Sequence, residues 1–186
     1  MTSGPLPSIE LSTPRLWIRK VSTLDAAFFL RLLNSPGWLT YIGDRQVHTE
    51  AAAAEYIRNR VLPGYNKPGY GSYAVGTHGT DEPLGFVGVF ERDTLAAPDF
   101  GFAFLPEGQG LGYGYEASRA LLRQPEILAL PELLAITLPE NDRSIRLLRK
   151  LGFQNDGVAS NGGDVPLLRF RRCQAKIAAP GKGAAI

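Results

Sequence analysis

Apolar residues recur along this chain with two different periods, which predicts a domain of mixed strands and helices. Alternating or continuously apolar runs between turn residues are typical of strands, and apolar residues three or four apart are typical of helices. The predicted strands cover 15–19, 73–77, 84–90, 99–105, 133–137, 153–158 and 165–170, and the predicted helices cover 22–34, 50–61, 110–123 and 141–151. The order is therefore strand, two helices, three strands, helix, strand, helix and two strands.

Capping and turn residues mark where several of these elements begin or end. Ser22, with Asp25 three residues later, has the arrangement of a capping box, and Thr49 is a candidate cap for the second helix. Pro36 is expected to end the first helix and Pro125 the third, because a proline disfavours helical geometry in the residue before it. The segment 160–164 is predicted to be the turn between the last two strands.

The same pattern indicates how the chain is divided. No linker or internal repeat interrupts residues 11–172, so this range is expected to be a single domain. Residues 1–10 are expected to be a flexible lead-in. Residues 173–186 are dominated by Ala, Pro and Gly and are expected to be a disordered tail.

Composition mainly excludes other classes of function. The 186 residues carry a formal net charge of +2, and the one dense basic run, residues 169–172, gives little support for nucleic-acid binding. A single cysteine, Cys173, allows no internal disulfide and suits a reducing cytoplasm. No stretch is apolar enough for a membrane span or a signal peptide, so no membrane partner is expected. No spaced cluster of Cys, His and Asp predicts a metal site.

The stretch 100–117 carries the clearest chemistry. An apolar strand is followed by glycines at alternate positions, Gly108, Gly110, Gly112 and Gly114, and then by residues that continue as a helix. Glycine allows positive φ and close approach of an anion, and a helix N-terminus adds unpaired N–H donors, so a phosphate ligand is predicted. The spacing fits neither the dinucleotide fingerprint nor the P-loop, which disfavours another nucleotide ligand.

The glycines instead fit Gln-x-x-Gly-x-Gly, from Gln109 to Gly114, and a second motif, Asn141-x-x-Ser144, continues to Leu-Gly-Phe at 151–153. With these two motifs the chain resembles the GNAT superfamily of N-acetyltransferases over roughly residues 12–172. The dipeptides Pro106-Glu107, before the loop, and Glu116-Ala117, after it, resemble those of one branch of the superfamily, the ribosomal-protein N-terminal alanine and serine acetyltransferases. The resemblance implies an α+β fold, with a mixed, mostly antiparallel central sheet of about seven strands flanked by about four helices.

The resemblance also implies a reaction. An acetyl group would pass from acetyl-CoA to a primary amine, either a protein N-terminus or a small molecule, by direct attack on the thioester. The alternative is an acyl-CoA-binding or sensing module with little turnover. The acceptor amine is the expected partner, with a homodimer left open. The implied coenzyme-binding residues are Phe104, Leu105, Gln109, Gly110, Leu111, Gly112, Tyr113, Gly114, Asn141 and Ser144, with a backbone N–H of Phe104 or Leu105 stabilising the oxyanion.

Two residues are candidates for proton transfer. Asp99, at the start of the strand before the glycine loop, matches a position where the related branch often carries Glu, and is the expected base; His48 and a bound water are the alternatives. Many superfamily members carry a tyrosine as the acid for the leaving thiolate where this chain has Leu148. Ser144 is therefore the expected donor. Asp99 as a turn residue, and Ser144 and Asn141 as parts of a helix cap, are the structural alternatives.

The acceptor side is less defined by the sequence. By resemblance, the loops 38–48 and 65–73 would form the walls of the acceptor pocket, and Trp38, Tyr41, Tyr70 and Tyr73 would give it aromatic surface, although each of them could equally fill core. Asp44 is the only acidic residue in the first loop, which argues against a polycationic acceptor.

Overall fold

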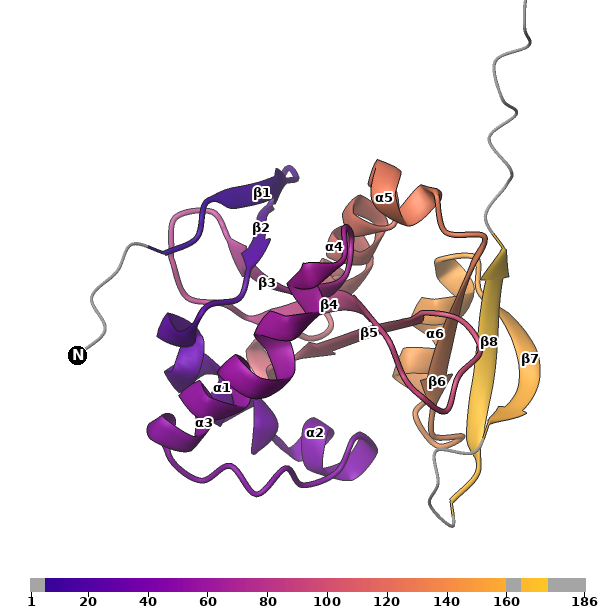
Figure 1. The fold of residues 1–186 in the computed structure, drawn as a ribbon, viewed down its shortest axis with the longest axis horizontal. Coiled ribbons are helices and arrows are strands. Elements are labelled where there is room, and N and C mark those ends of the chain that lie inside the picture. The colour runs from indigo at the N-terminus through magenta and orange to yellow at the C-terminus, as the bar shows by residue number, and fades with distance from the viewer. Residues whose placement is uncertain (1–5, 160–164, 174–186) are drawn as a thin grey trace, which may run out of the picture.

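Eight strands form one sheet in the computed structural model of the protein, which describes residues 6–159 and 165–173 (Figure 1). The strand order is β1-β2-β3-β4-β5-β6-β8-β7. The strands are β1 (Ile9–Ser12), β2 (Leu16–Lys20), β3 (Gly71–Thr77), β4 (Gly85–Phe90), β5 (Asp99–Phe104), β6 (Glu132–Thr137), β7 (Gln154–Ala159) and β8 (Leu167–Cys173). The fold class is the predicted one, α+β with a mostly antiparallel sheet.

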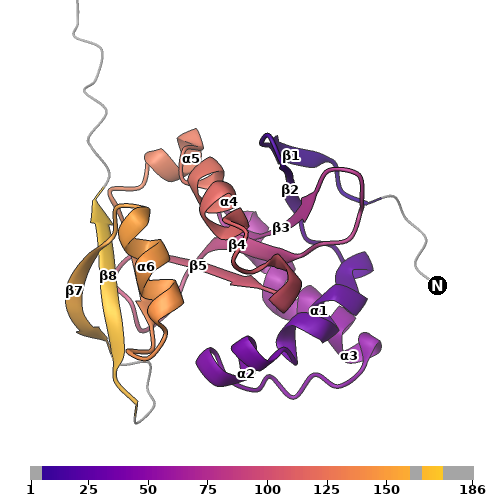
Figure 2. The same ribbon diagram turned by 180° about the vertical axis from the view of Figure 1, so that it is seen from behind.

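One pair of strands differs from all the others. Every neighbouring pair is antiparallel except β5 and β6, which are parallel and share a single register pair, Asp99 with Leu134. Beyond that pair the two strands separate, and β5 runs between the group β1 to β4 and the group β6 to β8 (Figure 2). The sheet is therefore open between β5 and β6, while β5 remains paired with β4 along its length.

Helices cover both faces of the sheet. One face carries α1 (Ala26–Leu33), α2 (Pro36–Tyr41) and α3 (Glu50–Tyr56), which pack with Trp17, Ala74 and Phe86 in one hydrophobic cluster. The other carries α4 (Tyr113–Leu121), α5 (Pro125–Leu128) and α6 (Asp142–Lys150), packed around Phe100, Phe153 and Phe170. Phe100 and Phe153 stack with ring centroids 5.6 Å apart. Each face of the sheet thus has its own core.

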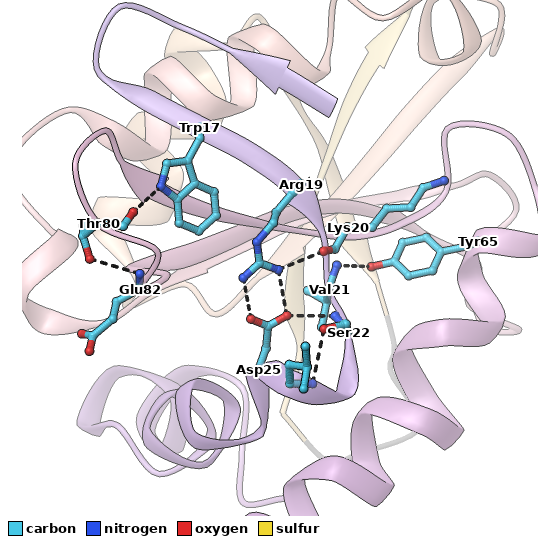
Figure 3. Close-up of polar contacts among 10 residues, drawn as sticks. Trp17, Arg19, Lys20, Val21, Ser22, Asp25, Tyr65, Thr80 and Glu82 are labelled. Atoms are coloured by element: carbon cyan, nitrogen blue, oxygen red, sulfur yellow. Dashed lines mark hydrogen bonds and ion pairs between the residues drawn. The ribbon is translucent and has the colours of Figure 1, made fainter. Parts of the chain in front are cut away.

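A buried ion pair fastens β2 to the start of the first helical layer (Figure 3). Arg19 donates from both terminal nitrogens to Asp25, at 2.7 and 2.9 Å, and both side chains are almost completely buried. The Asp25 carboxylate also accepts from the Ser22 N–H at 2.8 Å, which completes the capping box that the sequence predicts. Tyr65 holds the same region by accepting from the Val21 N–H at 2.8 Å.

The structure adds elements that the sequence pattern did not predict. Strand β1 begins at Ile9, inside the expected lead-in. Pro36 and Pro125 lie in the first turn of α2 and α5, because the residue that ends one helix is also suited to begin the next. With these elements, the described residues contain eight strands and six α-helices, against the predicted seven and four.

Some predictions fall outside the described residues. These are the turn at 160–164, residues 1–5 of the lead-in, and residues 174–186 of the predicted tail. Cys173 itself is the last residue of β8. Within the described ranges, no helix has both the length and the apolar character that a membrane crossing requires.

Candidate active site

A cleft of about 1,680 Å³ lies where β5 and β6 separate. Its walls come from β4, β5 and β6, from the glycine loop and α6, and from α2 and the segment after α3. It joins the predicted phosphate-binding loop to Asp99 in one continuous space. Among the described residues, no group of three or more His, Cys, Asp or Glu side chains could hold a metal ion.

The glycine loop leads into the N-terminus of α4. Gly110 and Gly112 have φ of +77° and +80°, which a side chain would strain, and Gly112 is the N-cap residue of α4. With no capping side chain at Gly112, the first N–H groups of the nine-residue helix have no intrahelical acceptor. Gly114 serves close packing, because an added Cβ would lie 3.3 Å from Leu147 of α6. The cleft therefore has free backbone donors and the positive helix end at one side.

Side chains on either side hold this loop in place. Gln109 donates to the Phe104 carbonyl at 2.8 Å and accepts from Arg143 of α6 at 2.9 Å, so both ends of its amide are used in bracing. Arg15 of the β1–β2 turn donates to the Leu111 carbonyl at 3.0 Å and to Glu116 at 2.7 Å. The loop is thus held by side chains of α6 and of the β1–β2 turn before any ligand binds.

The backbone of β5 presents a donor to the cleft. The Leu105 N–H donates to the Leu84 carbonyl at 2.8 Å, so this group is already used. In an antiparallel pair the backbone groups of successive residues point alternately toward and away from the partner, so those of Phe104 point away from β4. The Phe104 carbonyl accordingly accepts from Gln109. Because β6 has already separated here, the Phe104 N–H, of the two predicted oxyanion donors, faces the cleft.

Asp99 lies at the point where β5 and β6 diverge. It is 2% exposed and lines the cleft. One carboxylate oxygen, Oδ2, accepts from Nε of Arg92, and the other, Oδ1, has no hydrogen-bond partner among the described residues. Burial raises the pKa of Asp99 to about 6, although the Arg92 guanidinium and the backbone N–H of Ile136 act in the opposite direction. A carboxylate with this pKa can accept a proton near neutral pH.

The second motif lies at the N-terminus of α6, across the cleft from β5. Asn141 is the N-cap and accepts from the Ser144 N–H at 3.1 Å, so the predicted capping role of Asn141 is present. The Ser144 hydroxyl lines the cleft and has no partner among the described residues. Leu148 is 1% exposed and offers no donor, as the sequence indicates.

The predicted acceptor-side aromatics separate into two groups. Trp38 and Tyr41 line the cleft, with the Trp38 ring against Phe86 at a centroid distance of 6.2 Å. Tyr73 instead pairs with Val87 and packs into the core on the α4 side, and Tyr70 packs against that same core, so neither lines the cleft. His48 is exposed and also lies outside the cleft lining.

Three predicted coenzyme contacts have other surroundings. Leu105 is buried in the cluster beneath α1 to α3, Leu111 is exposed with its carbonyl toward Arg15, and the Tyr113 ring lies 4.8 Å below the Arg15 guanidinium. None of the three lines the cleft, whereas the remaining predicted residues do: Phe104, Gln109, Gly110, Gly112, Gly114, Asn141 and Ser144.

Sequence reasoning missed several charged residues of the cleft. Arg92 contacts Asp99 from the β4–β5 loop, and Arg45 and Arg60 line the cleft from the segments after α2 and α3. Arg143 and Arg146 of α6 also line it. No local pattern marks these residues, because the cleft is formed by segments far apart in the chain.

In this site the parallel strands β5 and β6 diverge beside a glycine loop that leads into the N-terminus of α4. This arrangement is that of the acyl-coenzyme A-dependent transferases. The sequence profile of the acetyltransferase (GNAT) domain matches residues 15–154, and the chain belongs to this family. It is 25% identical over 150 residues to the uncharacterized N-acetyltransferase YoaA of Bacillus subtilis, covering 80% of this chain and 84% of that protein.

Solved structures share the fold. A ribosomal-protein alanine acetyltransferase from Vibrio fischeri superposes with a TM-score of 0.75 at 16% identity, covering 91% of this chain and 98% of that one. The RimL ribosomal α-N-protein acetyltransferase, solved with coenzyme A, gives a TM-score of 0.72 at 16% identity, covering 89% and 98%. Its membership of the acetyltransferase (GNAT) family makes the protein an acetyl-CoA-dependent N-acetyltransferase with an amine acceptor.

Proposed function

We propose that the protein acetylates a primary amine, a protein N-terminal α-amine or a small-molecule amine, by direct attack of the amine on the thioester of acetyl-CoA. The observation that carries this proposal is the single cleft that connects the N-terminus of α4 to the buried carboxylate of Asp99. One end suits a pyrophosphate and the other suits a group that must lose a proton.

The coenzyme would bind along the opening between β5 and α6. The N–H groups at the start of α4 would hold the pyrophosphate, and Arg143 and Arg146 line the same part of the cleft with positive charge. Asn141 would contact the pantetheine arm while it caps α6. The Phe104 N–H would donate to the oxygen of the tetrahedral intermediate, in the place where no second strand takes that bond.

Proton transfer would involve two residues of the cleft lining, Asp99 and Ser144, each of which carries an oxygen with no hydrogen-bond partner among the described residues. The Asp99 carboxylate, which is buried in the cleft wall, would accept the amine proton through one water as the new C–N bond forms. The Ser144 hydroxyl would donate a hydrogen bond to the departing thiolate. No covalent intermediate on the protein is required, and Cys173 lies exposed at the end of β8.

A sensing module with weak turnover is the second candidate, and one observation favours it. The position from which many relatives donate to the thiolate is filled by Leu148, which is buried and apolar. Calorimetry with acetyl-CoA, coenzyme A and ATP, followed by release of free thiol in the presence of amines, separates the two. Selective coenzyme binding with turnover supports catalysis, and binding without turnover on a wide panel supports sensing.

The coenzyme site can be tested at Gly112 with a matched pair of substitutions. Asp and Asn both tolerate positive φ and both can cap a helix, so Gly112→Asp and Gly112→Asn strain the loop equally. Only Asp places a negative charge at the N-terminus of α4. We expect the Kd for coenzyme A, measured by calorimetry, to rise about tenfold more in the Asp variant than in the Asn variant. Equal effects in both variants would mean that no phosphate binds there.

The role of Ser144 can be tested separately from its place in the helix. Because Asn141 supplies the cap, Ser144→Ala leaves that hydrogen bond to the backbone intact. We expect kcat to fall about tenfold or more, the range of a hydrogen bond to a charged group, with no change in the Kd for coenzyme A. The control is Asn141→Ala, which should lower the free energy of unfolding by about 1 kcal/mol. An unchanged kcat in Ser144→Ala would remove Ser144 from the mechanism.

A further inference from the structure

The acceptor half of the cleft carries positive charge that has no partner in the part of the chain that the structure describes. Arg45, in the segment after α2, and Arg60, in the segment after α3, are both exposed, line the cleft, and form no ion pair or hydrogen bond with any described residue. The nearby acids are engaged elsewhere. Glu91 pairs with Lys67, and Asp44 accepts from the backbone and side chain of Gln46 at 2.7 and 2.6 Å.

These arginines lie on the same side of the sheet as the free carboxylate oxygen. Asp99 pairs with Phe90 across β4 and β5, and directly opposed residues share one face of a sheet. Four residues along, and so on the same face of the strand, Ala103 pairs with Phe86, which packs with Trp38 in the cluster beneath α1 to α3. The face that carries Asp99 is therefore the face that carries α2 and α3, and the segments with Arg45 and Arg60 follow those two helices.

We propose that the acceptor is a peptide with a free amino terminus followed within a few residues by acidic side chains. This inference rests on the proposed function and adds the class of substrate. The amine would reach Asp99 while the carboxylates pair with Arg45 and Arg60 at the mouth of the cleft. An unpaired guanidinium at a cleft mouth attracts carboxylates and repels cations, so polycationic amines bind less well.

Apolar side chains at the same mouth favour a peptide over a free amino acid. Tyr41 and Ile42 are 39% and 40% exposed, and both line the cleft, as Arg45 does. A free amino acid held at Asp99 has no chain to cover these side chains. A peptide in extended conformation advances about 3.3 Å per residue and can contact Asp99, the arginines and this apolar surface together.

The test compares three peptides of equal length that share an N-terminal Ser and differ at the next three positions, which are Glu, Gln or Lys. Acetylation of each is measured as kcat/KM by release of free thiol, with glutamate as the free amino acid. We expect kcat/KM to fall in the order Glu, Gln, Lys, by about three- to tenfold at each step, and glutamate to be a poor acceptor. The preference should weaken as salt is raised.

Substitutions then assign the preference to the two arginines. Arg45→Gln and Arg60→Gln should each reduce the Glu-to-Gln ratio of kcat/KM about threefold, and Arg60→Glu should favour the Lys peptide. The matched control is Arg58→Gln, because Arg58 is exposed in the same segment as Arg60 but does not line the cleft. The Kd for coenzyme A should be unchanged in every variant.

The outcomes distinguish this inference from the proposed function. If wild-type protein acetylates the Glu and Gln peptides equally, or if Arg58→Gln has the same effect as Arg60→Gln, the inference fails while acetylation of amines stands. If glutamate is a better acceptor than any peptide, the substrate is a free amino acid and the inference also fails. If coenzyme A binds and nothing is acetylated, the proposed function itself fails.

Discussion

Replacing Asp99 with Asn is expected to lower kcat/KM about 100-fold or more, because the substitution removes the proposed base and keeps its shape. In the wild-type protein the pKa of Asp99 is raised to about 6 by burial, so the carboxylate is protonated below that pH. We therefore expect kcat/KM to fall as pH decreases through about 6, and this acid limb to be absent in Asp99→Asn. Thiol release measured from pH 5 to pH 9 checks both points.

A structural role for Asp99 predicts different behaviour. The pKa of Asp99 is higher in the folded state than in the unfolded chain, so at pH 8 the ionised carboxylate destabilises the folded state. Asp99→Asn removes that charge and should melt no lower than the wild type at pH 8, while it loses activity. Asp93→Asn is the control, because Asp93 is exposed in the β4–β5 loop that precedes Asp99 and does not line the cleft. A loss of activity that merely followed a loss of stability would contradict the assignment.

The fold could be predicted largely from local patterns, and the exceptions have physical causes. The capping box of Ser22 and Asp25 and the short strand at 133–137 are set by neighbours in the sequence, and both are present. The short helices α2 and α5 were missed because a proline such as Pro36 or Pro125 disfavours continuation of the preceding helix and also favours the first turn of a new one. Strand β1 has four residues and little burial, so it has no apolar pattern to detect.

The candidate site also has one part that could be predicted from the sequence and one part that could not. The glycine loop and the cap of α6 are contiguous segments, so their residues could be named from the sequence. The acceptor side depends on which face of the sheet each side chain takes. Tyr73 and Trp38 are both aromatic residues of segments predicted to form the acceptor pocket. The register of β3 nevertheless directs Tyr73 into the α4-side core, while α2 presents Trp38 to the cleft. Gln109 fitted a coenzyme motif, and in the structure both ends of its amide brace the loop.

Asp99 and Asp25 show that burial of a carboxylate has two different uses here. Asp25 is surrounded by donors from Arg19 and the Ser22 N–H, so its charge is fully compensated and serves the fold. Asp99 keeps one buried oxygen with no hydrogen-bond partner among the described residues, so its charge is only partly compensated. The two residues should therefore respond to substitution in opposite ways.

Replacing Asp25 with Ala is expected to lower the free energy of unfolding by about 3–5 kcal/mol, because Arg19 would be left buried without its counter-charge (Figure 3). The guanidinium would retain only its bond to the Lys20 carbonyl at 3.1 Å and its position 5.0 Å from the Trp17 ring. For a domain of this length the loss corresponds to a decrease in Tm of roughly 10 °C or more. Urea unfolding of the full chain measures it directly.

Two further variants show whether the loss arises from the uncompensated charge. Arg19→Met combined with Asp25→Ala removes both charges and should be less destabilised than the sum of the two single variants, because no buried ion is left unpaired. Glu10→Gln breaks the exposed pair with Lys20, whose atoms are 3.8 Å apart, and should cost less than about 1 kcal/mol. If Asp25→Ala were no more destabilising than Glu10→Gln, the buried pair would contribute nothing beyond a surface contact, and β2 and α1 would be held together by their apolar packing alone.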